Sequence, residues 1–373
     1  MLGLYIHIPF CSSICNYCNF NRGLYDEELK NRYVQALLEE IRLAGNGESA
    51  DSIFFGGGTP SLLEPLEVAS IIETCRESFS LNSGTEITLE ANPETVSFEK
   101  LVGFKSSGVT RLSYGVQSFR DDELVRLSRL HSANCAREAV GFARAAGFNN
   151  VSLDLMMWLP QQSVSQWLES VDSLIGLDPD HASLYLLELY PGAPLREEMA
   201  QQMWSLAPDD DAADMYLEGM AKLDAAGYHQ YEISNVAKPD KESRHNLKYW
   251  TDGEWLGFGC GAHSTRDGVR WMNRSGTEDY INAVKNRGLV QINTRKLTKE
   301  EQLEETLFTG LRLASGVDLG KISHHYGVDV WAKFRNELQV FLDRGLLSYD
   351  QGCLKLTRHG MLLSHEVMRV FVG

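Results

Sequence analysis

Three cysteines that lie close together are the first candidates for chemistry: Cys11, Cys15 and Cys18, in the pattern C-x3-C-x2-C. They follow the apolar run 4–8, which Pro9 ends, so we expect them on a loop at the carboxyl end of a buried strand. Thiolates suit a soft metal centre, and iron–sulfur clusters are usually held by cysteine. A [4Fe–4S] cluster bound by three cysteines keeps one iron open, so this spacing predicts a cluster that binds a further ligand.

A zinc site is the alternative, because a tetrahedral zinc ion held by these thiolates needs a fourth ligand, for which Cys260 and His7 are candidates. The remaining cysteines are scattered, and we expect single buried thiols at Cys75, Cys135, Cys260 and Cys353. An odd total of seven cysteines, three of them clustered, fits a metal site in a reducing cytoplasm better than a set of disulfides.

Glycines and polar residues follow other apolar runs that we interpret as strands. The run Gly56-Gly-Gly-Thr-Pro60 follows the second of them, and we expect its amide groups and the Thr59 hydroxyl to meet a charged amino-acid moiety. Glu90, Gln117 and Asp154 lie in or at the ends of later strands. A carboxylate among apolar residues is costly unless it is paired or used, so Asp154 is expected to bind a ligand hydroxyl. Taken singly, a tight turn and internal hydrogen bonds are the structural alternatives.

The alternation of apolar runs predicts how these residues are positioned. We expect strands at 4–8, 52–55, 86–91, 111–116, 151–157 and 182–189, and helices at 28–43, 65–79, 98–106, 133–146 and 164–175. Continuous apolar strands alternating with helices indicate a parallel sheet with helices on its outer face. The expected fold class is α/β, a partial (β/α)6 barrel of the TIM type. Loops at the carboxyl ends of such strands carry the chemistry, and the candidate residues fall there.

Three parts are expected along the chain: the barrel at 1–228, a segment at 229–297 that covers the open side of the arc, and a small domain at 298–373. The last part predicts helices at 300–313, 319–326 and 330–344, a hairpin at 346–356 and a final helix. Helices followed by a β-wing resemble a winged-helix domain. Because this part begins with several glutamates, we expect it to dock a partner protein and not DNA.

Composition excludes several classes of protein. With 373 residues, 43% hydrophobic and 23% charged, the chain can bury a sizeable core. A net charge of −16 argues against a nucleic-acid binder, which needs clustered Lys and Arg. No apolar run approaches the roughly 20 residues that span a bilayer, and the first residues lack the charged start of a signal peptide. We therefore expect a cytoplasmic protein without stable membrane insertion.

Four blocks in this order resemble one family: Tyr5-Ile-His-Ile-Pro-Phe-Cys11, Gly56-Gly-Gly-Thr-Pro60, Glu90-Ala-Asn-Pro93 and Gly115-Val-Gln-Ser-Phe119. They are similar to the oxygen-independent coproporphyrinogen III oxidase-like group of the radical S-adenosylmethionine (SAM) superfamily. The resemblance implies that Cys11, Cys15 and Cys18 hold a [4Fe–4S] cluster whose open iron is chelated by SAM. It implies further contacts from Tyr5 and Tyr17, from Gly57, Gly58 and Thr59 at the methionyl amino end, and from Glu90, Gln117, Arg129 and Asp154, the last at the ribose hydroxyls. By itself, Arg129 would be expected on the surface.

Two branches of this family differ near the cysteines. Coproporphyrinogen III dehydrogenases carry a further cysteine two residues beyond the third ligand and an N-terminal arm, whereas this chain has Phe20 there and only four residues before Tyr5. Both differences favour the HemW-type haem chaperones, as does His245-Asn-Leu-Lys-Tyr249-Trp250, which is similar to a signature of that branch. The resemblance implies a protein that binds haem as cargo and passes it to a haem-accepting protein. A homodimer is left open.

The His245 motif has two interpretations. An imidazole is a good iron ligand, and Tyr249 and Trp250 would flank a flat macrocycle. Alternatively, His245 and Trp250 pin the connecting segment to the barrel. His263 is a second candidate ligand.

Other functions on the same fold are a coproporphyrinogen III dehydrogenase, a radical SAM methyltransferase, and an iron–sulfur electron carrier in which the glycine run would be idle. The sequence leaves open whether SAM is cleaved. One position also departs from the family pattern, because Trp158 stands where a glycine usually precedes Leu-Pro. A bulky side chain near the mouth of the site is expected to narrow the cavity or change its occupant.

Overall fold

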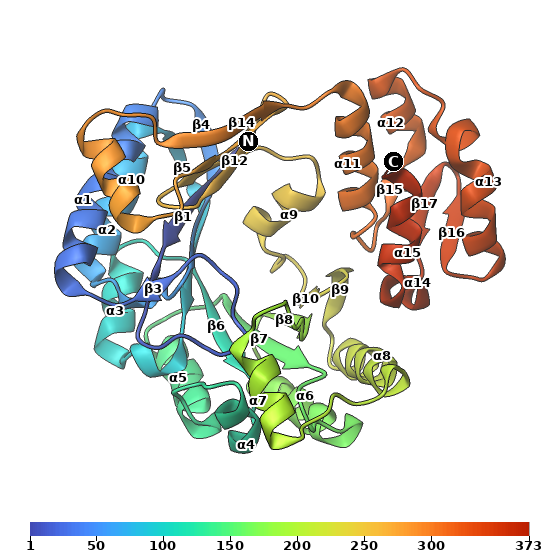
Figure 1. Cartoon of the computed structure of the whole chain (residues 1–373), viewed down its shortest axis with the longest axis horizontal. Helices are drawn as coiled ribbons and strands as arrows, with labels where there is room; N and C mark the ends of the chain where they lie inside the picture. The colour runs from blue at the N-terminus through green and yellow to red at the C-terminus, as the bar shows by residue number, and fades with distance from the viewer. Residues whose placement is uncertain (373) are drawn as a thin grey trace.

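The computed structural model describes residues 1–372. A sheet of 12 strands runs through it in the order β14-β13-β12-β11-β1-β4-β5-β6-β7-β8-β10-β9. Its centre is parallel and bent into an arc, and helices cover the outer side of the arc (Figure 1). The α/β class and the partial barrel are confirmed.

The six central strands are β1 (Leu2–Ile8), β4 (Ser49–Gly57), β5 (Ser80–Ala91), β6 (Arg111–Gln117), β7 (Val151–Met157) and β8 (His181–Leu186). The helices on the outer side are α1 (Glu27–Ala44), α2 (Pro65–Ser78), α3 (Phe98–Ser106), α4 (Asp121–Arg126), α5 (Ala133–Ala145) and α6 (Val164–Gly176). Side-chain caps set where helices begin, since Ser97, Ser132 and Ser163 each accept a hydrogen bond from a backbone N–H in the first turn. The strand β5 begins at Ser80 and not at residue 86 as predicted, because its first residues are polar and lack the apolar pattern from which the strand was predicted.

The period of two along the strands separates the two faces of the sheet. Leu4, Ile6 and Ile8 of β1 are fully buried in the hydrophobic core beneath the helices. Tyr5 and His7, between them, face the inner side of the arc, where Tyr5 packs against residues of other elements. The inner face therefore carries the candidate site.

The segment 229–297 adds strands to both edges of the sheet, which the sequence did not predict. On one side β10 (Asn235–Ala237) pairs with β8, and β9 (His229–Glu232) pairs with β10. On the other side β11 (Trp255–Phe258) pairs in parallel with β1, followed by β12 (His263–Arg266), β13 (Val269–Asn273) and β14 (Gln291–Lys296). Between the two sets, α9 (Arg244–Trp250) lies inside the arc (Figure 1).

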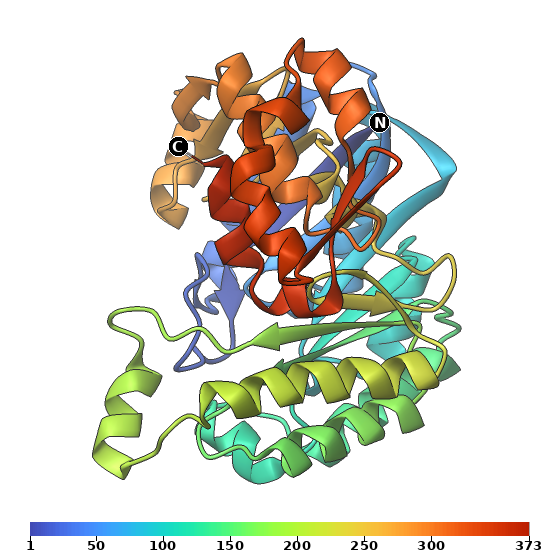
Figure 2. The ribbon, with the colours of Figure 1, turned by 90° about the vertical axis from the view of Figure 1, so that its right-hand side faces the viewer.

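Three further helices complete the part before residue 298: α7 (Pro194–Gln202), α8 (Asp209–Ala225) and α10 (Thr277–Lys285). In the turned view α7 projects away from the rest of the molecule (Figure 2). No helix within residues 1–372 has the length and apolar character needed to cross a membrane.

The C-terminal part packs across the open side of the arc, beyond α9 (Figure 1). Its elements are α11 (Lys299–Gly310), β15 (Val317–Asp318), α12 (Leu319–Tyr326), α13 (Val330–Asp343), β16 (Leu347–Asp350), β17 (Cys353–Leu356), α14 (Arg358–Leu362) and α15 (Ser364–Met368). The three predicted helices and the hairpin are present, but the single final helix is wrong: two short helices and a 3-10 turn replace it. The division into three domains stays a prediction.

Candidate functional site

The cysteine loop leaves β1 and is tied down at both ends. Its first residues form β2 (Phe10–Cys11), which pairs with β3 (Gly23–Leu24). In the middle, the Cys18 carbonyl accepts hydrogen bonds from Arg22 and, over 2.8 Å, from the Tyr190 hydroxyl. All three thiols are half-buried. The loop is therefore held in place by backbone and side-chain contacts of the protein alone.

Two of the three thiols accept hydrogen bonds from residues far along the chain. The Thr59 hydroxyl lies 3.6 Å from the Cys11 sulfur, and the Arg129 guanidinium lies 3.5 Å from the Cys15 sulfur. Asn92 connects these two donors, because its amide nitrogen donates to the Thr59 hydroxyl (3.2 Å) and its oxygen accepts from Arg129 (2.7 Å). The sequence analysis named Asn92 only as part of a motif and did not predict this role. Its position between the end of β5 and Pro93 was the signal that could have indicated it.

These surroundings fit thiolate ligands. Burial raises the pKa of the Cys11 and Cys18 thiols, while the Thr59 hydrogen bond at Cys11 and the Phe20 backbone with the Arg22 charge at Cys18 oppose that rise. A metal centre binds the deprotonated thiolate, and donors around the sulfur stabilise that form. The cluster that the spacing predicts therefore has a suitable donor set.

The alternative ligands for a zinc ion are engaged elsewhere. His7 uses both ring nitrogens, Nδ1 with the Tyr5 hydroxyl (3.2 Å) and Nε2 with the Asn21 carbonyl (2.8 Å). Cys260 is buried, with its sulfur near Asn21 and Thr277. Within residues 1–372, no three His, Cys, Asp or Glu side chains converge on a single-ion position. Neither His7 nor Cys260 supplies a fourth ligand in this conformation.

The glycine loop packs directly on the start of the cysteine loop. The Gly58 N–H donates to the Ile8 carbonyl and the Thr59 N–H to the Phe10 carbonyl, both over 2.8 Å. A Cβ atom on Gly58 would lie 2.7 Å from the Phe10 carbonyl oxygen, so only glycine fits this approach. The amide groups of Gly58 and Thr59 are therefore used within the chain, and the expectation that the glycine run meets a charged ligand stays a prediction. The loop can instead accept hydrogen bonds from an ammonium group through its carbonyl oxygens.

The carboxyl groups of Glu90 and Asp154 face the inner side of the arc from β5 and β7. Burial raises the pKa of Glu90 to about 8, with the nearby Asp154 charge adding to the rise. Burial also raises the pKa of Asp154 to about 6, against hydrogen bonds from Ser183 and Ser113. A pair of carboxyl groups held in this way favours a cationic or hydroxyl-bearing ligand.

Gln117 and Arg129 are brought together at the end of β6. Gln117 has a positive φ of 67°, and the Arg129 guanidinium donates to the Gly115 carbonyl over 2.6 Å. A Cβ atom on Gly115 would lie 2.9 Å from the Gln117 side-chain nitrogen. Arg129 is thus not a surface residue but a link between β6, Asn92 and the cysteine loop.

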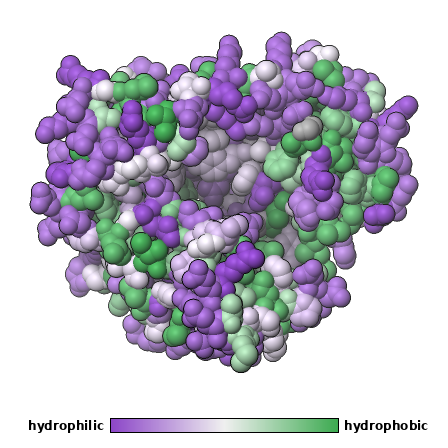
Figure 3. Space-filling model, in the orientation of Figure 1, coloured by the Kyte–Doolittle hydropathy of each residue, from purple (hydrophilic) through white to green (hydrophobic). Residues whose placement is uncertain are grey.

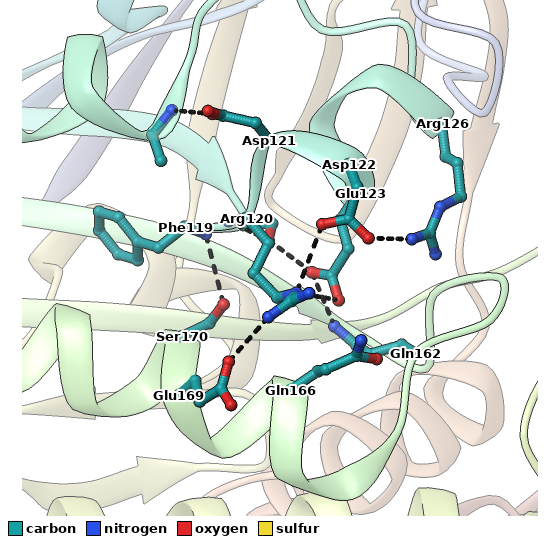
Figure 4. Close-up of polar contacts among 12 residues, drawn as sticks. Phe119, Arg120, Asp121, Asp122, Glu123, Arg126, Gln162, Gln166, Glu169 and Ser170 are labelled. Carbon is teal, nitrogen blue, oxygen red and sulfur yellow. Dashed lines mark hydrogen bonds and ion pairs between the residues drawn. The ribbon is translucent and has the colours of Figure 1, made fainter.

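A polar network beyond β6 fixes the turn that carries these residues (Figure 4). Glu123 is fully buried and accepts hydrogen bonds from the Ser118 hydroxyl and from Gln162 (3.1 Å). Burial raises the pKa of this carboxyl group. Arg120 lies among the carboxylates and reaches Glu169 at 2.8 Å, which connects the turn to α6. Breaking this network would loosen Gln117 and Arg129 from a distance.

The two predicted aromatic residues lie in different parts of the chain, Tyr5 on β1 and Tyr17 within the cysteine loop. Tyr17 is next to Arg129 and the thiols of Cys15 and Cys18, and burial raises its pKa. Tyr5 stacks on Phe54 with ring centroids 6.2 Å apart. Both tyrosines are therefore neutral and near the residues that the resemblance assigns to SAM.

His245 lies inside the arc, fully buried, with both ring nitrogens engaged. Its Nδ1 is 3.0 Å from the Ser52 hydroxyl and its Nε2 is 3.0 Å from the Tyr249 hydroxyl. Burial lowers its pKa to about 3, with the Lys248 charge second in effect. No nitrogen is free for iron in this conformation, so the contacts favour the interpretation that His245 anchors the connecting segment. The role of His245 as a haem ligand stays a prediction.

Trp250 and the second candidate histidine differ in environment. The Arg312 guanidinium lies over the Trp250 ring at 4.2 Å and pairs with Glu232 at 3.1 Å, which ties α9 to the C-terminal part. His263 is exposed on β12. The motif therefore joins barrel and C-terminal part, whereas His263 presents an accessible imidazole.

Trp158 occupies a backbone position that favours glycine, with φ of 62°. Its indole N–H donates to the Ala207 carbonyl over 2.8 Å, and its ring packs against the core. The side chain thus ties the segment after α7 to the end of β7. A narrowed cavity stays a prediction.

The face of the molecule in Figure 3 is hollowed at its centre, and the walls of the hollow have intermediate hydropathy within a hydrophilic rim. Tyr185, which follows the inner-facing Ser183 along β8, is 42% exposed, so the inner face of the sheet is reached by solvent.

Comparison with known proteins agrees with this architecture. The Radical SAM superfamily model matches residues 5–174, and the HemN C-terminal domain model matches residues 297–363. The solved coproporphyrinogen III oxidase (HemN) from Escherichia coli, a radical SAM enzyme, has a TM-score of 0.86 at 24% identity, over 99% of this chain and 89% of that chain. Fold and site together define a radical SAM protein with a HemN-type C-terminal domain.

Curated relatives narrow the family. Heme chaperone HemW of Bacillus subtilis (strain 168) is 37% identical over 377 residues, covering 100% of both chains. HemW of Escherichia coli (strain K12) is 34% identical, covering 100% of this chain and 98% of the relative. The mitochondrial radical S-adenosyl methionine domain-containing protein 1 of Mus musculus is 39% identical, covering 98% of this chain and 86% of the relative. The chain belongs to the HemW-type family of radical SAM proteins, which confirms the expected branch.

Proposed function

We propose that this protein is a cytoplasmic haem chaperone that holds a [4Fe–4S] cluster, binds SAM beside it, and delivers haem to a haem-accepting protein. Relatives similar over their full length carry the name heme chaperone, which supports the cargo. The thiols of Cys11, Cys15 and Cys18 would hold the cluster, which when bound supplies a reducible centre with one open iron site.

The observation that carries this proposal is the chain of contacts from Cys11 through Thr59, Asn92 and Arg129 to Cys15. It brings residues of four separate loops around one set of thiols. A structural role alone does not require hydrogen-bond donors on two half-buried sulfurs. A cluster whose ligands are thiolates does require such donors, because they stabilise its negative charge.

The remaining residues would bind and orient SAM. Glu90 and Asp154 would face its cationic groups and ribose hydroxyls, and the carbonyl oxygens of the glycine loop would accept from its amino group. Tyr5 and Tyr17 would exclude water on either side. Haem would enter the hollow seen in Figure 3, and the exposed His263 is a more accessible imidazole than the buried His245.

The test is anaerobic reconstitution of the cluster, followed by titration with haem and then by incubation with SAM, reductant and coproporphyrinogen III. We expect stoichiometric haem binding, transfer of haem to an apo haem protein, and no vinyl-bearing porphyrin product. His263→Ala should weaken haem binding, with the exposed His229→Ala as the matched control.

A coproporphyrinogen III dehydrogenase is the second candidate, favoured by the fold shared with HemN. Phe20, where that branch carries a further cysteine, is 65% exposed and opposes it. Turnover of coproporphyrinogen III with SAM consumption would overturn the chaperone in favour of the enzyme.

A further inference from the structure

Arg111 is a buried arginine that none of the contacts above uses. It is the first residue of β6 and only 1% exposed. Within residues 1–372 its guanidinium makes no ion pair, and its Nε has no hydrogen-bond acceptor. A buried charge without a partner is costly. Its presence therefore points to a group that it stabilises across space or to a ligand.

Strand register places Arg111 beneath the two carboxyl groups of the site. Arg111 is aligned with Thr88, and Ser113 with Glu90, while Gly115 is aligned with Asp154. Alternate residues of a strand share one face, so Arg111 lies on the inner face below the level of both carboxyl groups. The Ser113 hydroxyl, between the levels, donates to Asp154 over 3.4 Å.

The charge of Arg111 acts on both carboxyl groups. It opposes the rise in pKa that burial causes at Glu90 and at Asp154. Arg129, the other cation near Asp154, is already engaged with Asn92 and Cys15. Arg111 is thus a cation that acts on both carboxyl groups, and its Nε has no hydrogen-bond acceptor.

The other titratable groups around Arg111 carry no competing charge. His181 of β8 bonds through both nitrogens to Ser152 and Tyr231 (2.8 Å each), and burial lowers its pKa. The nearby hydroxyl groups of Tyr5, Tyr231 and Tyr249 have raised pKa values, caused first by burial, and are neutral.

The two remaining carboxylates nearby have partners of their own. Glu86 of β5 accepts the His245 N–H over 3.3 Å, and Glu232 of β9 pairs with Arg312.

We propose that Arg111 is a positioning residue for SAM: its buried charge favours the ionised forms of Glu90 and Asp154 when a cationic ligand binds above them. The inference rests on the proposed function, because it takes SAM as that ligand. SAM carries a positively charged sulfonium group, so ionised carboxylates close to it favour its binding. Arg111 lowers the cost of ionising them in a buried place and does so without contact with the ligand.

The test is calorimetric titration of SAM into the cluster-loaded full chain at pH 7, in phosphate and in Tris, which gives both Kd and the number of protons released. In Arg111→Met we expect Kd to rise at least about tenfold, and more protons to be released, because both carboxyl groups start protonated. Arg111→Lys keeps the charge and should stay within about threefold of the unmodified protein. A loss of packing alone would change Kd without changing proton release.

Unchanged Kd and proton release in Arg111→Met would overturn the inference. If that variant does not fold, Arg111→Lys decides: unchanged proton release with a similar Kd supports the charge role, and a tenfold loss refutes it. If the cluster-loaded protein itself ignores SAM, the proposed function fails. Infrared titration of the SAM-free carboxyl groups then still tests Arg111, since Arg111→Met should raise their titration range and no shift would refute it.

Discussion

The Thr59 hydroxyl donates to the Cys11 thiol over 3.6 Å, although 48 residues separate them in the sequence. The two loops that carry the proposed cluster and SAM contacts are therefore one unit. A change in one loop is expected to be felt in the other, and the redox behaviour of the cluster is where this can be measured.

Thr59→Val should lower the reduction potential of the cluster, because a hydrogen bond to a ligand sulfur stabilises the reduced, more negative state. The measurement is a redox titration followed by electron paramagnetic resonance. Thr85→Val, at a buried threonine of β5 bonded only to the Ala50 carbonyl, is the matched control. An unchanged potential in Thr59→Val would show that the contact is not made in the loaded protein.

Cys15→Ala should abolish the brown absorbance of the reconstituted protein and its bound iron and sulfide, because three thiolates are the whole predicted ligand set. Cys135→Ala, at a half-buried thiol on α5, should keep full loading. Full iron and sulfide in Cys15→Ala would refute the ligand assignment.

SAM binding at pH 7 should release about one proton from Glu90. The pKa of this carboxyl group is raised to about 8, so it starts protonated and must ionise beside a cationic ligand. Affinity should therefore rise as the pH rises from 6 toward 8. Calorimetry in buffers of different ionisation enthalpy measures the release. Glu90→Gln should remove it, whereas Glu99→Gln on the exposed side of α3 should not.

His245→Gln should destabilise the protein by about 1–3 kcal/mol at pH 7.5, because two buried hydrogen bonds lose a partner. The pKa of His245 is lowered to about 3 in the folded chain and lies near 6.5 when unfolded. Its neutral form therefore contributes stability above pH 6.5 that is lost as the pH falls toward 3. Denaturant unfolding of His245→Gln should show a flatter pH dependence in that window than His229→Gln. Full stability with loss of haem binding would instead support the iron-ligand interpretation.

Much of the barrel was readable from local pattern. In the barrel, the strand at 151–157 and the helix at 98–106 were predicted with the observed bounds, and so was the helix at 319–326 in the C-terminal part. At these helices the spacing of apolar residues and the capping residue indicate the same bounds. Strands β9 to β14 were not predicted, since short, mixed runs such as Trp255–Phe258 reveal their partners only through long-range pairing. The broken last helix had no proline or glycine run to announce it.

The candidate site was predicted mainly from sequence motifs and to a smaller extent from physical arguments. The cysteine spacing and strand-end carboxylates indicated where chemistry lies. Arg111 gave no signal, because a charged first residue of a strand is ordinarily solvated, whereas this one is only 1% exposed. Asn92 was part of a named motif, but the contacts of its amide group with Thr59 and with Arg129 were not predicted. The pattern also gave no sign that the Gly58 and Thr59 amide groups donate to the Ile8 and Phe10 carbonyls of β1 and β2.

Strand β1 lies between β4 and β11, so its two hydrogen-bonding edges are completed by residues 49–57 and by residues 255–258. A growing chain that has been synthesised only to residue 250 leaves one edge of β1 bare. The strand that precedes the thiol loop is therefore completed only by pairing with the last third of the sequence.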